Sequence, residues 1–158
     1  MNKHKTLSVE LIHVPRHLLK HLFTLDMAYK REFCGFFTGV YFGKQDVILH
    51  VENFHWVTNL LSEHQQDVAD YRMDPQQMMN VLKNTSVMDL KSKTQAVSVH
   101  NHPHSVGIPS VIDSGEYRRG NGHNVPYLIW GGGDKILRGW KWNYENDGYT
   151  SVKLEIHE

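Results

Sequence analysis

The sequence is poor in cysteine, because Cys34 is the only one among 158 residues. A single cysteine cannot form an internal disulfide, and it cannot supply the paired cysteines of a cysteine-rich zinc site. The fold therefore has to rest on a hydrophobic core, and a chain of this length is long enough to bury one. We expect residues 1–158 to form one domain in which Cys34 is a small buried residue rather than a nucleophile.

Net charge and long apolar runs are missing as well. Seventeen basic and seventeen acidic residues give zero formal charge, which argues against a surface that follows the phosphates of a nucleic acid. No run approaches the ~20 apolar residues of a membrane span. The apolar residues at 7–12 are too few and too interrupted for the core of a secretory signal. We expect a cytoplasmic protein with neither a nucleic acid nor a membrane as partner.

Histidine, by contrast, is abundant, with 12 in the chain. Two of them, His100 and His102, follow small and β-branched residues at 95–99 that alternate as in a strand. Side chains two residues apart on a strand point the same way, so these two histidines share a face. Pro103 cannot donate a hydrogen bond to a neighbouring strand, so the strand should end there and a turn should follow.

A second group of polar residues follows this turn. Pro109 suits the first turn of a helix, and Ser110 and Asp113 are then three apart on one helical surface. The end of the strand and the start of the helix can therefore face a common point. Imidazole nitrogen and carboxylate oxygen are ligands that zinc takes, and three protein ligands with one open position are typical of catalytic zinc. A zinc hydrolase is the leading hypothesis.

Such a site needs a base, and Glu32 is the candidate. It precedes an apolar run that starts at Phe33, where an acidic side chain is out of keeping with its neighbours. Taken alone, Glu32 has the ordinary interpretation of a solvated residue at the end of a strand. Glu32 becomes a candidate base only in combination with the histidine motif.

Together, these segments resemble the JAMM family of metalloproteases, also called JAB1/MPN/Mov34. The family signature is a distant Glu, then His-x-His, seven residues, Ser, two residues and Asp. It is matched by Glu32, His100-Asn101-His102, Ser110 and Asp113. The resemblance is strongest with the small stand-alone prokaryotic members, whose Glu-x-Cys-Gly-x-x-x-Gly matches residues 32–39. Further similarities lie at Asn59, at residues 71–75 and at residues 136–142.

The resemblance implies roles for the matched residues. His100, His102 and Asp113 would bind one zinc ion, and Glu32 would take the proton from the water bound to it. Ser110 would stabilise the oxyanion of the tetrahedral intermediate. The implied substrate is the isopeptide or peptide bond after the C-terminal tail of ubiquitin, or of a ubiquitin-like or sulfur-carrier-like protein. The protein would be a deubiquitinase-like hydrolase.

The implied fold is the cytidine-deaminase-like JAB/MPN arrangement, an α/β (α+β) fold in which helices flank a mixed, mainly antiparallel sheet. A strand at about 7–12, a helix opened by Pro15, and a hairpin of strands at 34–41 and 47–56 agree with it. We place Leu18, Leu22 and Met27 on the apolar face of that helix, with Leu19 and Leu25. A capping box at 74–77 predicts a second helix, and three further strands are expected at 125–130, 135–144 and 149–156.

Two polar loops, at 57–71 and 114–124, are expected to determine the substrate. A flexible substrate tail could add as an extended strand along an exposed edge of the sheet.

One departure from the family keeps other functions open. Many relatives have Ser between the two histidines, whereas Asn101 is more typical of a branch associated by name with DNA repair. A DNA-repair-associated protein of this fold is therefore one alternative. A non-catalytic scaffold is a second, and an iron site built from the same two histidines and carboxylate is a third.

Overall fold

The computed structural model describes residues 9–29, 31–42, 47–61, 71–83, 94–109, 126–143 and 148–158. Seven strands and two helices lie within these ranges. In chain order they are β1 (Val9–Pro15), α1 (Arg16–Ala28), β2 (Cys34–Phe42), β3 (Val47–Val57), α3 (Pro75–Leu82), β4 (Thr94–His102), β5 (Pro126–Gly131), β6 (Ile136–Asn143) and β7 (Gly148–His157). The expected strands, and the helices expected after Pro15 and at 74–77, are confirmed to within a few residues. The helix expected after Pro109 falls on residues outside the described ranges. None of the helices in these ranges is long and apolar enough to cross a membrane.

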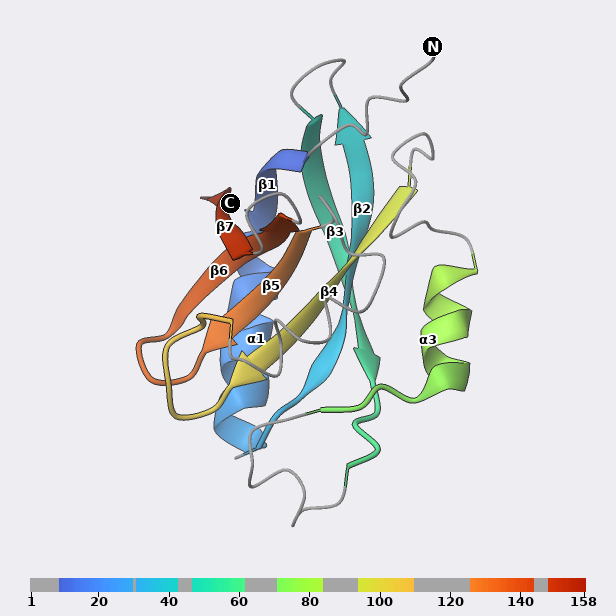
Figure 1. Ribbon diagram of the computed structural model, residues 1–158, viewed down its shortest axis with the longest axis vertical. Coiled ribbons are helices and arrows are strands. Elements are labelled where there is room, and N and C mark those ends of the chain that lie inside the picture. The colour runs from blue at the N-terminus through green and yellow to red at the C-terminus, as the bar shows by residue number, and fades with distance from the viewer. Residues whose placement is uncertain are drawn as a thin grey trace.

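The strands form one sheet in the order β1-β3-β2-β4-β5-β6-β7, and the sheet closes on itself because β1 pairs with both β3 and β7. The pairs β1–β3, β1–β7 and β4–β5 are parallel, and the other neighbours are antiparallel. The sheet is therefore mixed and mainly antiparallel, as expected. Helix α1 lies behind it, and α3 lies beside β3 (Figure 1). The fold class is α+β.

Closure of the sheet restricts where a substrate tail could add as a strand. Each described strand has a neighbour on both sides, so an open edge remains only where a pairing stops. The pairing of β1 with β3 stops at His13 and His50. An exposed edge is therefore available only along short stretches, such as the part of β3 beyond His50.

The main core lies between α1 and one face of the sheet. Leu18 and Leu22 of α1 are buried in it, and truncation of one such leucine to alanine typically costs ~2–5 kcal/mol. The prediction for Met27 is wrong, because its side chain is 58% exposed. Met27 follows Leu18 by nine positions, which at about 100° per residue puts it on the opposite side of the helix. Asp26 takes the inward position and is 6% exposed.

A smaller core lies on the other face of β2, β3 and β4, where α3 packs. Phe36 and Val57 are buried there against Met78 and Leu82. The Asp74 carboxylate caps α3 by accepting hydrogen bonds from the backbone N–H groups of Gln76 and Gln77, as its position predicts.

The second half of the expected capping box does not form. The Gln77 side chain instead bonds Thr58, accepting from its N–H at 2.7 Å and donating to its hydroxyl at 2.9 Å. These bonds attach α3 to the chain that leaves β3.

Two glycines let β3 approach β2 closely. A Cβ atom at Gly35 would collide with the carbonyl oxygen of His55, and one at Gly39 would collide with that of His50. These are the two glycines of the pattern that follows Glu32. They let β2 lie tightly beside β3, and so fix the start of β2, just after Glu32.

Candidate metal centre

His100 and His102 lie side by side on the face of β4 that is directed toward α3. The two residues are 0% and 7% exposed, and the Nε2 atoms of their rings are 3.3 Å apart. Alternation along β4 puts Ala96, which packs in the core beneath α3, on the same face. The prediction that the two histidines share a face is confirmed.

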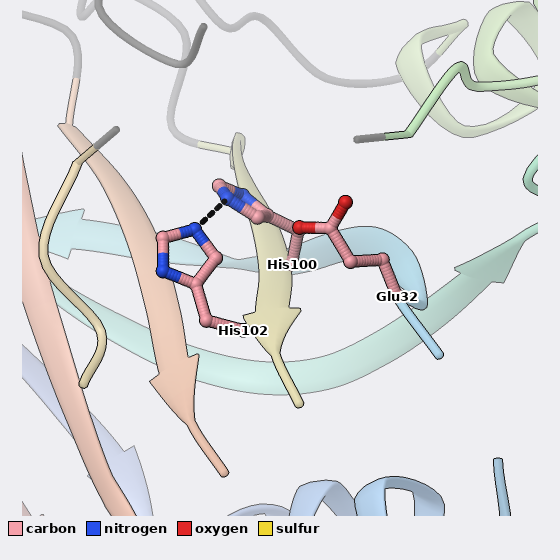
Figure 2. A group of neighbouring side chains, drawn as sticks. All are labelled: Glu32, His100 and His102. Atoms are coloured by element: carbon pink, nitrogen blue, oxygen red, sulfur yellow. Dashed lines mark hydrogen bonds between the residues drawn. The ribbon is translucent and has the colours of Figure 1, made fainter. Parts of the chain in front are cut away.

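Glu32 meets the histidines from the segment that leads into β2. Cys34 is the register partner of His100 in the antiparallel pair β2–β4, so Glu32, two residues earlier, lies on the same face next to His102. One carboxylate oxygen and one nitrogen from each ring all lie within 4.8 Å of one another, and Figure 2 shows the three side chains together. Glu32 is 4% exposed, which excludes a solvated strand end.

The turn after β4 sets the tautomer of His102. Its Nδ1 atom is 3.2 Å from the carbonyl oxygen of Val106. A carbonyl oxygen only accepts, so Nδ1 carries a proton, and in the neutral ring Nε2 keeps a lone pair directed at His100. A backbone carbonyl that orients the far nitrogen of a ring is typical of metal-bound histidine. The donor set of two imidazoles and a carboxylate fits a divalent cation such as zinc.

The site is enclosed by an aromatic ring and by the buried thiol of Cys34. The ring of Tyr71 packs on that of His100, with centroids 4.5 Å apart. Cys34 is fully buried, and its Sγ donates to the carbonyl oxygen of Val57 at 3.4 Å. Burial, with the nearby charge of Glu32, raises the pKa of the Cys34 thiol to about 12. The thiol therefore stays protonated, as expected of a structural cysteine.

Two of the predicted site residues, Ser110 and Asp113, lie outside the described residues, as do positions 62–70 and 114–124 of the two predicted loops. The strand ends at His102, and the turn that follows it is confirmed as far as Pro109. The structure thus brings together Glu32, His100 and His102.

Asn101 has a role that its position between the histidines did not reveal. It points to the opposite face of β4, where it is 0% exposed. Its Oδ1 accepts from the N–H of Phe33 at 2.6 Å, and its Nδ2 donates to Asp26 at 2.9 Å. Asp26 in turn pairs with Lys135 at 3.1 Å. The side chain that motivated the DNA-repair alternative is therefore engaged inside the protein.

The fold and this site define an α+β protein with a candidate metal centre of two histidines and a glutamate. The model of a family described as prokaryotic homologues of the JAB domain matches residues 15–143. The chain belongs to this family.

Two solved structures agree on the fold. A protein from Desulfitobacterium hafniense is 19% identical, with 93% of each chain covered and a TM-score of 0.70. One from Salinibacter ruber is 19% identical over 92% of this chain and 91% of that chain, with a TM-score of 0.59. A JAB1/MPN domain protein from Archaeoglobus fulgidus is 16% identical over 96% and 98%, with a TM-score of 0.48. No curated protein matches the sequence significantly.

Proposed function

We propose that this protein is a zinc-dependent isopeptidase or peptidase that cleaves the bond after the C-terminal tail of ubiquitin or of a ubiquitin-like or sulfur-carrier-like protein. The observation that carries the proposal is the convergence of Glu32, His100 and His102 within 4.8 Å in a buried site. Membership of the JAB family supports it.

His100, His102 and Asp113 would hold the metal, with Asp113 supplying the third ligand from beyond the turn. Zinc in such a site lowers the pKa of a water molecule toward about 7 and polarises the carbonyl group of the substrate. His102 is prepared for this role, because its Nδ1 proton is bonded to Val106 and its Nε2 lone pair is directed at the site.

Glu32 would be the general base. A buried carboxylate beside the two imidazoles can accept the proton of the attacking water and return it to the leaving amine. The hydroxyl of Ser110 would donate a hydrogen bond to the oxyanion, and the loss of one such donor commonly lowers turnover ~100- to 1000-fold. The buried thiol of Cys34, with its raised pKa, takes no part in this scheme.

We also propose that residues 1–158 make one JAB/MPN domain. The family match covers 15–143, and β7, which lies beyond it, completes the closed sheet by pairing with β1. We propose the cytoplasm as its compartment, since a buried free cysteine is compatible with a reducing environment.

The test measures the cleavage of a panel of ubiquitin-like C-terminal fusions with and without a chelator, together with the metal content of the purified protein. About one zinc per chain and chelator-sensitive cleavage are expected. A folded wild-type protein that binds no zinc would overturn the proposal and favour the scaffold alternative. Bound iron with redox activity and no hydrolysis would favour the iron alternative.

Glu32→Gln sharpens this test. The amide keeps the shape of the side chain but cannot accept the proton, so turnover should fall by at least ~100-fold while zinc is retained. Glu52→Gln, at an exposed position on β3, is the matched control and should leave turnover unchanged. An active Glu32→Gln protein would show that another group is the base.

A further inference from the structure

The peptide unit between Glu32 and Phe33 is held at both of its polar ends. Its carbonyl oxygen, on Glu32, accepts a hydrogen bond from Nδ2 of Asn59 at 3.3 Å. Its N–H group, on Phe33, donates to Oδ1 of Asn101 at 2.6 Å. A peptide unit is planar, so two bonds in opposite directions fix both its position and its plane.

Each asparagine is itself held in place. Oδ1 of Asn59 accepts from the backbone N–H groups of Leu61 and Arg72, at 3.1 and 2.9 Å. These bonds fix the amide so that its Nδ2 group is directed at Glu32. The clamp on the carbonyl side is therefore built from the chain that leaves β3.

The clamp on the N–H side is built from β4 and α1. Nδ2 of Asn101 donates to Asp26, which is 6% exposed and is paired in turn with Lys135. This assigns the amide orientation of Asn101, because its nitrogen has to face the carboxylate of Asp26 and its oxygen has to face Phe33. The ring of Phe33 is fully buried and anchors the same segment in the main core.

We propose that Asn59 and Asn101 are positioning residues, which hold the backbone of Glu32 so that its carboxylate meets His100 and His102. Asn101 lies between the two histidines. The same short piece of β4 therefore carries the imidazoles on one face and, through the bond from Asn101 to Phe33 on the other face, positions Glu32. The distance from the Glu32 carboxylate to the two imidazoles is thereby set by one short segment, residues 100–102 of β4. This inference rests on the proposed function, and the residues act through Glu32 without touching the substrate.

The first test is Asn101→Ala, measured for kcat, KM and zinc content. A base displaced by less than about 1 Å commonly costs up to ~100-fold in rate, so kcat should fall ~10- to 100-fold. KM should stay within about twofold, because binding of the tail is untouched. Zinc should be retained. Leu22→Ala, in the same core, is the control for general loosening, and it should leave kcat nearly unchanged at a comparable loss of stability.

Two further variants separate positioning from folding. The exchange Asp26→Asn with Asn101→Asp reverses the donor and acceptor between the two side chains and preserves the bond from Phe33, so it should restore kcat relative to Asn101→Asp alone. Asn59→Asp keeps both bonds from Leu61 and Arg72 but removes the donor to Glu32, and it should lower kcat ~10-fold with zinc retained.

The results distinguish this inference from the proposed function. If the wild-type protein is active and Asn101→Ala and Asn59→Asp lower kcat no more than Leu22→Ala does, the positioning role is overturned. The same holds if zinc is lost in parallel with activity, since the asparagines would then hold the histidines. A wild-type protein without chelator-sensitive cleavage overturns the proposed function itself.

Discussion

Two groups of histidines in this protein look alike in composition and differ in geometry. His100 and His102 lie on one strand beside Glu32. The second group, formed by His13, His50 and His157, lies across β1, β3 and β7 beside Glu155. Among the described residues, the ligand atoms of three such side chains come within 4.8 Å of one another only at Glu32, His100 and His102.

The second group is held together by other contacts. The centroid of the His13 ring lies 4.5 Å from that of the His50 ring, in an edge-to-face arrangement, and 5.9 Å from that of the His157 ring. Its Nε2 atom pairs with Glu155 at 3.0 Å. Burial, and the neighbouring charges of His13 and His157, lower the pKa of His50. Clustered imidazoles are therefore a candidate metal centre here only where burial and an orienting acceptor direct their nitrogens at one point.

The largest expected difference between the two groups is in metal binding. His102→Ala removes a proposed ligand and should reduce the zinc content from about one ion per chain to near zero. His50→Ala should leave it unchanged. Mass spectrometry of metal content on both purified variants checks this. Loss of zinc in His50→Ala but not in His102→Ala would mean that the second group holds the ion.

A smaller effect is expected from the turn that orients His102. A Cβ atom at Gly107 would collide with the carbonyl oxygen of Ile129, so Gly107→Ala should displace the adjacent Val106 carbonyl. Loss of such an orienting bond typically costs ~10- to 100-fold in metal affinity. A competition titration with a zinc chelator measures this.

Val106→Ala is the control for Gly107→Ala, because it keeps the carbonyl and changes only an exposed side chain. Wild-type affinity in Gly107→Ala would show that the Val106 bond does not prepare His102.

The smallest effect concerns pH and the second group. The pKa of His50 in the folded protein lies below its ordinary value of 6.5. As the pH falls through about 6.5, the unfolded chain therefore takes up the proton first, and stability declines until the folded pKa is passed. His50→Gln should abolish this part of the decline, worth about 1 to 3 °C in Tm for a partly exposed group. Thermal unfolding at about pH 8 and about pH 5 measures it, and an unchanged pH dependence would contradict the assignment.

Local patterns in the sequence were enough to predict one of the two histidine groups. The spacing of His100 and His102 on a strand, ended by Pro103, determines that they share a face, and this needs no knowledge of the rest of the fold. The β2–β3 hairpin and the Asp74 cap are equally local. Ser110 and Asp113 remain predictions.

Contacts between distant residues could not be predicted in this way. Asp26 and Asn101 are 75 residues apart, and an acidic residue on a helix gives no sign that it faces inward. The placement of Met27 failed for the same reason, because the position of α1 on the sheet decides which residues are buried. The row of His13, His50 and Glu155 likewise exists only because β1 pairs with both β3 and β7.

The closure of the sheet also has a consequence for the order of folding. Arg16 and Glu158, next to the strands that close the ring, form an ion pair across 142 residues of chain. Contacts between residues so far apart in sequence have a high entropic cost of loop closure, so they tend to form late. The residues that pair β2 with β4, and so align Glu32 with the histidines, are much closer along the chain. We therefore expect this alignment to form before β1 and β7 meet.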